Sequence, residues 1–264
     1  MENFNFHRPK SLADAVAALK GTEDGKFLAG GQSLIPALKL ELASFSDLVS
    51  LSDIDELKGV TASGGGLTIG AATTHAEVAK SAAVRETIPS LARMAEHIGD
   101  PQVRNRGTLG GSVAHADPAA DYPAAILALK AQIQTDRRTI GGDDFFTGLY
   151  ETALEDDEII KSVTFAKPDK SFYAKFDNPA SKYAIVGVYV AKFADGVRVA
   201  VTGAASAAFR MTAMEEALTA SFSADALAGI EVPTDDLNDE RNASPEYRAH
   251  LIKVMARRAV EQVI

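Results

Sequence analysis

The chain has 264 residues, a net charge of −9 and an ordinary composition, with 46% hydrophobic and 24% charged residues. These values are typical of a soluble globular protein of one or two domains and argue against a surface for nucleic acid or acidic membranes. Cysteine is absent, which excludes disulfides, thiolate nucleophiles and cysteine-ligated zinc or iron–sulfur clusters from this chain. We expect neither a signal peptide nor a membrane span, because no apolar region opens the sequence and no run of about 18 apolar residues occurs.

Strand and helix patterns alternate in the first part of the chain. In chain order we predict a strand at 4–9, a helix after the N-cap Ser11, a strand at 26–29, a helical or irregular segment at 34–42, a strand at 48–51, a hairpin at 60–70, a helix from a capping box at 74–77 and a helix at 88–98. Three glycines at 64–66 favour a hairpin turn over a phosphate loop, because strands flank them and no helix follows. His75, inside the capping box, is expected to face solvent.

The remaining pattern predicts a smaller second domain. We predict a helix at 122–131, a strand at 133–139, a helix or turn at 145–153, a strand at 158–165 and then a boundary at Pro168. Beyond it, we predict antiparallel strands at 171–176, 184–193 and 197–205, a helix at 211–219, a polar loop at 230–243 and a helix from 245 onward. The predicted fold class is α+β, with a domain at 1–167 and a smaller C-terminal domain at 168–264 that contains a three- or four-stranded antiparallel sheet.

Two polar stretches each contain a pair of glycines, AGGQSLIP at 29–36 and TLGGS at 108–112, the latter at the centre of a longer stretch at 98–124. Adjacent glycines permit positive φ and a close approach to a ligand, and flanking hydroxyls together with consecutive N–H groups suit an anion. The two stretches therefore predict a large phosphate-bearing ligand held from two sides. The alternative is a pair of tight turns, since such motifs produce false positives.

Other site chemistries have little support in the sequence. The five histidines include no pair at the i, i+4 spacing of a helical zinc site, and His115 with Asp117 lacks a third ligand. Ser33 and Ser112 do not lie in a G-x-S-x-G motif, so a hydroxyl that donates to phosphate explains both more simply. Neither the dinucleotide fingerprint of a Rossmann fold nor a P-loop occurs. We expect loops of another fold to hold the phosphate, and we assign no catalytic or metal-ligating residue.

At residues 29–36 and 104–124 the sequence resembles the two FAD-binding signatures of the flavoprotein subunit of molybdenum hydroxylases. The similarity is greatest to the medium chains of aerobic carbon monoxide dehydrogenases and smaller to the flavin domain of xanthine dehydrogenases. It continues at residues 156–163, 175–188 and 243–260, and so covers nearly the whole chain. The resemblance implies a two-part FAD-binding fold of the vanillyl-alcohol-oxidase (PCMH) type, with parts at about 1–55 and 56–167, followed by the C-terminal domain of the family.

The resemblance also implies roles for individual residues. The FAD-contacting positions would be Ala29, Gly30, Gly31, Gln32, Ser33, Leu34 and Ile35 on one side of the pyrophosphate, Thr108, Gly110, Gly111 and Ser112 on the other, Asp121 near the cofactor, Ile160 against the adenine, Lys175 at the flavin edge and Tyr183 over one isoalloxazine face. The alternatives are core packing for Ile160 and ordinary sheet positions for Lys175 and Tyr183.

Gln32 stands where some related loops carry a histidine that attaches FAD covalently. We expect dissociable FAD, because an amide nitrogen is not a competent nucleophile. Arg104 and Arg106 either offset phosphate charge or form a surface pair or a partner contact.

The same resemblance implies a place in a larger complex. Substrate would be oxidised at molybdopterin in a large partner subunit, and electrons would pass through two [2Fe–2S] clusters of a small subunit to FAD here and then to an external acceptor. The absence of cysteine fits this division. We expect a heterotrimer that dimerises, located in the cytoplasm or peripheral to the inner membrane face, with no nucleic-acid partner. The alternatives are an autonomous flavin oxidase or reductase and a non-enzymatic ligand-binding module.

Overall fold

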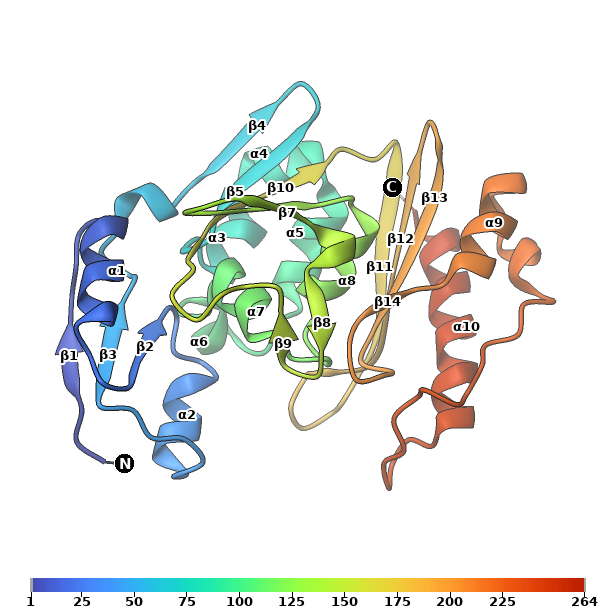
Figure 1. Cartoon of the computed structure of the whole chain (residues 1–264). Helices are drawn as coiled ribbons and strands as arrows, with labels where there is room; N and C mark the ends of the chain where they lie inside the picture. The colour runs from blue at the N-terminus through green and yellow to red at the C-terminus, as the bar shows by residue number, and fades with distance from the viewer. Residues whose placement is uncertain (1, 264) are drawn as a thin grey trace.

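The computed structural model describes residues 2–263, which form three sheets, a small hairpin and helices packed between and beside them (Figure 1). The strands are β1 (Asn5–His7), β2 (Gly25–Leu28), β3 (Asp47–Ser50), β4 (Val60–Ser63), β5 (Gly66–Gly70), β6 (Gln132–Thr135), β7 (Thr139–Gly141), β8 (Phe146–Gly148), β9 (Glu151–Thr152), β10 (Ile160–Ala166), β11 (Lys170–Asp177), β12 (Ala184–Phe193), β13 (Gly196–Thr202) and β14 (Phe209–Arg210). The α-helices are α1 (Leu12–Lys20), α2 (Leu34–Lys39), α3 (His75–Lys80), α4 (Ala82–Thr87), α5 (Pro89–Glu96), α6 (Pro101–Arg104), α7 (Leu109–His115), α8 (Tyr122–Ala128), α9 (Thr212–Ala220) and α10 (Pro245–Glu261). None of the helices in the described residues has the length and apolar character needed to cross a membrane.

The first sheet is parallel, with strand order β1-β3-β2, and α1 packs on it. The central strand β3 is buried at every position, as expected for a parallel strand covered on both faces. Ser11 caps α1 as predicted, because its hydroxyl accepts a hydrogen bond from the Asp14 N–H at 3.1 Å. This sheet and α1 lie at the left of Figure 1, apart from the C-terminal helices.

The second sheet is antiparallel and has the order β4-β5-β10-β6-β7. The β4–β5 hairpin confirms the predicted turn at Gly64 and Gly65, since Ser63 pairs with Gly66. A continuous apolar core joins this sheet to α3, α4, α5, α7 and α8. Figure 1 shows these helices between the second and third sheets, and the core accordingly reaches Tyr189 and Ala200 of the third sheet.

The third sheet, β11-β12-β13-β14, is a four-stranded antiparallel sheet, which confirms the predicted C-terminal sheet. Side chains of β12 alternate between two cores. Val188 and Val190 face α9 and α10, whereas Tyr189 and Ala191 face the central helices. Both faces of the strand are therefore covered, which explains why nine of its ten residues are buried.

Two predictions for the middle of the chain are correct only in part. The segment expected as a helix or turn at 145–153 has a turn at Leu149 and Tyr150, but strands β8 and β9 flank this turn, and Phe146 pairs with Thr152. The single strand expected at 133–139 is two strands, β6 and β7, joined by a turn in which Thr135 accepts hydrogen bonds from the backbone N–H groups of Arg137 and Arg138. In both places a tight turn interrupts a residue pattern that suits strand and helix equally.

Candidate functional site

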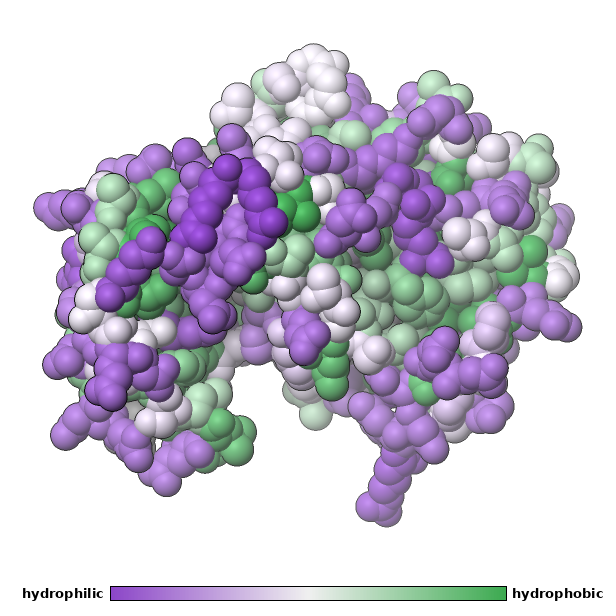
Figure 2. Space-filling view, viewed as in Figure 1, coloured by the Kyte–Doolittle hydropathy of each residue, from purple (hydrophilic) through white to green (hydrophobic). Residues whose placement is uncertain are grey.

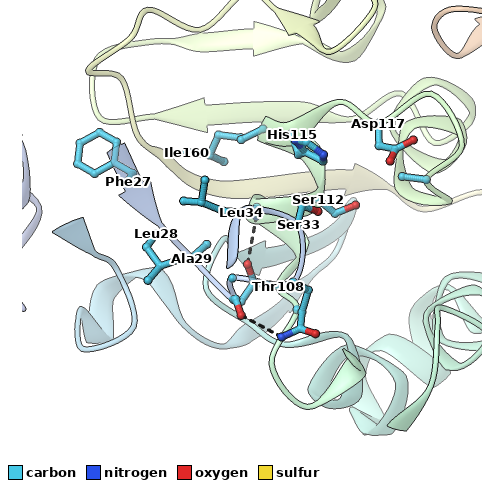
Figure 3. A pocket seen from close by; sticks show the side chains of 18 of the residues that line it. Phe27, Leu28, Ala29, Ser33, Leu34, Thr108, Ser112, His115, Asp117 and Ile160 are labelled. Carbon is cyan, nitrogen blue, oxygen red and sulfur yellow. Dashed lines mark hydrogen bonds between the residues drawn. The ribbon is translucent and has the colours of Figure 1, made fainter. Parts of the chain in front are cut away.

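A cavity of about 830 Å³ opens beside the first sheet, within the size range of small-molecule sites. Its walls come from β2 and the loop after it, from α7, from the β8–β9 hairpin and from the segment around Tyr183. Figure 2 shows the molecule hollowed between the region around α2 and the central part, and Figure 3 labels lining side chains of β2, of the loop after it and of α7. Every predicted cofactor-contacting residue lines this cavity except Ile35 and Lys175.

The two double-glycine segments contact each other. A Cβ atom at Gly30 would lie 2.7 Å from the Gly107 Cα and closer still to the Arg106 carbonyl oxygen, and a Cβ at Gly111 would lie 3.1 Å from the Ala29 Cβ. Gly31 has a φ of +72°, which L side chains rarely adopt. Gly30 and Gly111 are therefore required first by the close contact between the two chain segments, and the residues of this contact that line the cavity include Ala29, Gly30 and Gly111.

The backbone N–H groups of the two segments differ in their availability. Thr108 is the N-cap of α7, and the N–H groups of Leu109, Gly110 and Gly111 donate to the Thr73 carbonyl, the Ala71 carbonyl and the Thr108 hydroxyl. The Ser112 N–H donates to the Thr108 carbonyl. The prediction that N–H groups of this segment turn toward an anion is therefore wrong for residues 109–112.

In contrast, the N–H groups of Gly31, Gln32, Ser33 and Leu34 have no acceptor among the described residues. These four consecutive N–H groups, in a loop that lines the cavity, are available to a phosphate.

Asp121 lies in the cavity wall and is buried. Its carboxylate accepts a hydrogen bond of 2.6 Å from the Tyr173 hydroxyl and pairs with the Lys175 Nζ at 3.0 Å. Burial raises the pKa of Asp121, against the opposing effects of Lys175 and Tyr173. Lys175 thus acts behind Asp121 rather than at the cavity surface. Tyr173 was not predicted from the sequence, although its i, i+2 spacing from Lys175 places both side chains on one face of β11.

His75 is buried, so the prediction that it faces solvent is wrong. The capping box of Thr74 and Glu77 forms as predicted, but the His75 ring is only 5% exposed and lines the cavity. The ring fits because Gly107 has no side chain: a Cβ there would lie 2.7 Å from the His75 Nε2. Burial, together with the nearby charge of Arg104, lowers the pKa of His75 to about 4.

Polar and aromatic side chains surround the outer part of the cavity. His115, Asp117, Tyr150 and Tyr183 all line it, and burial raises the pKa of Tyr183, with further contributions from Asp117 and Tyr150. Tyr150 was not predicted from the sequence as a site residue.

The two arginines proposed to offset phosphate charge do not line the cavity. Arg104 donates to the carbonyls of Ile98 and Gly99, and Arg106 is exposed. Within residues 2–263, no three His, Cys, Asp or Glu side chains are grouped to hold a metal ion, so His115 and Asp117 have no third ligand there.

The comparison with protein families identifies the group to which these features belong. Residues 2–168 match the family described as the FAD binding domain in molybdopterin dehydrogenase. The chain belongs to this family. The predicted resemblance is thereby confirmed, and the FAD-binding family assignment covers both glycine segments and the whole first two sheets.

Relatives with this FAD-binding domain are similar along their full length. The carbon monoxide dehydrogenase medium chain of Hydrogenophaga pseudoflava is 35% identical, over 97% of this chain and 96% of the relative. The nicotine 6-hydroxylase medium subunit of Paenarthrobacter nicotinovorans is 36% identical, over 97% and 95%. The reconstituted CO dehydrogenase from Oligotropha carboxidovorans superposes with a TM-score of 0.90 at 32% identity, over 99% of this chain and 97% of that one. The α+β prediction agrees with this fold.

The cavity fits the FAD of this family. A diphosphate needs several donors, and the cavity wall offers the N–H groups of Gly31 to Leu34, which have no acceptor among the described residues, and the Ser33 and Ser112 hydroxyls. Phe27, Leu28 and Ile160 add apolar surface to the same cavity, where Figure 3 shows them, and ring systems need such surface. Gln32 donates to the Gly30 carbonyl and has no nucleophilic nitrogen, which agrees with a dissociable cofactor.

Proposed function

We propose that this chain is the FAD-carrying electron-transfer subunit of a molybdenum hydroxylase complex of the carbon monoxide dehydrogenase type. The observation that carries the proposal is the single cavity lined by both glycine segments, with four unpaired N–H donors in one of them. When bound there, FAD supplies the redox chemistry between the iron–sulfur clusters of a partner and an external acceptor. The protein supplies binding and electrostatics.

Individual residues have distinct parts in this proposal. Gly31 to Leu34 hold the diphosphate through their N–H groups, and Ser112 adds a hydroxyl. Asp121 presents a buried carboxylate to the cavity, and Tyr173 and Lys175 fix its position. Tyr183 covers a ring. No dense acid–base cluster is needed, because C–H oxidation takes place in a partner subunit.

The proposed assembly contains a large molybdopterin subunit and a small iron–sulfur subunit, arranged as a dimer of heterotrimers in the cytoplasm. Support comes from the names of the relatives, which are medium chains or subunits, and from the absence of cysteine, which excludes cysteine-ligated clusters from this chain. We also propose domains at 1–167, in two parts, and 168–264. The family match ends at residue 168, which supports this boundary.

The test is FAD binding to the purified full-length chain, followed by absorbance and titration. We expect a yellow protein that releases its flavin on denaturation without turning over a substrate by itself. Gly30→Ala forces apart the two contacting segments and should weaken FAD binding by tenfold or more, on the order of 1.4 kcal/mol. Gly64→Ala is the control, because a Cβ there meets nothing within 4 Å.

Three outcomes would contradict the proposal. A chain that takes up no FAD, alone or with co-purified partners, would leave only a ligand-binding module of another kind. Substrate turnover by the isolated chain would favour an autonomous flavin oxidoreductase. Equal FAD affinity of the Gly30→Ala and Gly64→Ala variants would remove the glycine contact from the binding site.

A further inference from the structure

Strained backbone is concentrated around the outer part of the cavity. Among the described residues, three of the five non-glycine positions with positive φ are found there: Ala116 (φ 49°), Tyr150 (φ 57°) and Lys182 (φ 64°). Each is a cavity-lining residue or is adjacent to one. A left-handed conformation costs an L residue about 1–2 kcal/mol, and such strain persists where the surrounding structure or a function requires it.

Two tyrosines are left exposed by this backbone arrangement. Tyr150, at the tip of the β8–β9 hairpin, is 53% exposed, and Tyr183, between β11 and β12, is 42% exposed, yet both line the cavity. Tyr150 is near enough to Tyr183 to contribute to the raised pKa of Tyr183. Large aromatic side chains left open at a cavity mouth are typical of surfaces that a ligand covers.

Tyr150 also has a ring neighbour at the end of α7. The His115 and Tyr150 ring centroids are 5.2 Å apart, with an interplanar angle of 42°. His115, labelled in Figure 3, lines the same cavity, and the left-handed Ala116 follows it directly. The adjacent Leu149 is equally exposed, at 55%, but does not line the cavity. The strained turn therefore directs the tyrosine, and not its neighbour, to the mouth.

We propose that Tyr150, held by His115, forms a stacking site for a planar heteroaromatic ring of the dinucleotide, as a second aromatic wall beside Tyr183. The inference rests on the proposed function, because the ligand is FAD. Both ends of FAD carry a planar ring, and the neighbouring Tyr183 favours the flavin end over the adenine end.

The test measures FAD affinity and flavin fluorescence in the full-length chain. Tyr150→Ala should weaken FAD binding about three- to tenfold, as for the loss of one aromatic contact, and should increase the fluorescence of the bound flavin. Tyr150→Phe should keep wild-type values because it keeps the ring. Leu149→Ala is the matched control on the same hairpin tip and should change neither quantity.

Titration with riboflavin and with ADP shows whether the flavin or the adenine is stacked. Tyr150→Ala should lower the affinity only for the ligand that carries the stacked ring.

Two further variants separate ligand binding from a structural role. Tyr150→Gly relieves the positive φ and should raise the melting temperature of the FAD-free protein while it weakens FAD binding. Because His115 acts through Tyr150, His115→Ala should weaken binding less than Tyr150→Ala, and the double variant should match Tyr150→Ala. If wild type binds FAD and Tyr150→Ala binds it equally, with unchanged fluorescence, the stacking site is overturned and the proposed function stands. If wild type binds no FAD, alone or in its complex, both fail.

Discussion

Two buried polar regions of this molecule are built in opposite ways. In the C-terminal part, Arg248 is 2% exposed, and its guanidinium donates to the carbonyls of Ala243, Ile185 and Gly203 and to the Glu240 carboxylate. Beside the cavity, by contrast, His75 Nδ1 and the Tyr122 hydroxyl are buried without a partner. They are the two buried side-chain polar atoms in residues 2–263 that lack one.

The fold departs from ordinary packing rules beside the cavity and not in the C-terminal part. Buried polar groups are nearly always hydrogen-bonded, so exceptions call for an explanation. Here the exceptions, His75 and Tyr122, have ring centroids 5.4 Å apart, and His75 lines the cavity. The strained Tyr150 lines the same cavity. Such departures are expected at functional sites, and the satisfied Arg248 network serves the fold.

The two regions are nevertheless connected through hydrogen bonds to backbone carbonyls. The Gly203 N–H donates to the Pro118 carbonyl at 2.7 Å, and the Thr202 hydroxyl donates to the Ala120 carbonyl at 2.6 Å. The chain held in this way leads directly into Asp121 in the cavity wall. Arg248, which binds the Gly203 carbonyl, therefore stabilises a strand end that supports the candidate site.

The largest expected effect comes from removing the satisfied network. Arg248→Met leaves the Ile185 and Gly203 carbonyls without their donor and should cost about 4 kcal/mol of unfolding free energy, at about 1–3 kcal/mol for each orphaned group. Arg257→Met, an exposed position on the same helix, should change stability by less than about 0.5 kcal/mol. Urea unfolding measures both, and a loss below about 1 kcal/mol for Arg248→Met would show that the network is not essential to the fold.

A smaller effect is expected from pH at the unsatisfied pair. Burial lowers the pKa of His75 from 6.5 to about 4. As the pH falls, the unfolded chain binds the proton first. Folding stability should therefore be complete above pH 6.5 and should decrease between pH 6.5 and 4, by about 3 kcal/mol. His75→Phe should abolish this loss in urea unfolding at several pH values.

Glu158 provides an internal reference for that measurement. Hydrogen bonds from Arg138 hold the pKa of Glu158 at about 2, below its ordinary 4.5. Its contribution to stability should be present above pH 4.5 and lost as the pH falls toward 2, in wild type and His75→Phe alike. A wild-type profile that is flat between pH 6.5 and 4 would contradict the buried, neutral His75.

The smallest expected effect compares two helix caps. Thr108→Ala and Ser11→Ala each remove a hydroxyl that accepts a backbone N–H, and each should cost about 1 kcal/mol in thermal or urea unfolding. Only Thr108 lines the cavity, so only Thr108→Ala should also weaken FAD binding. Thr108→Ser, which keeps the cap, should restore both properties. Equal loss of FAD affinity in the two alanine variants would mean that the cavity responds only to global stability.

Features that depend on near neighbours in the chain could be predicted from the residue pattern. The caps at Ser11 and Thr74, the Gly64–Gly65 turn and the alternating strand β12 follow from spacings of two to four residues, and the structure has all of them. The glycine segments likewise predicted a shared site, and both line one cavity.

Which groups remain free to act on a ligand depends on contacts that form in the folded chain. Gly30 lies against the Arg106–Gly107 backbone, the space left by Gly107 admits the His75 ring, and Arg248 finds its acceptors on two strand ends. These contacts join segments far apart in the chain, where spacing carries no information. Sequence patterns predict which face of a helix or strand a residue occupies. Burial, free N–H groups and the strain at Tyr150, in contrast, arise only when segments far apart in the chain come into contact.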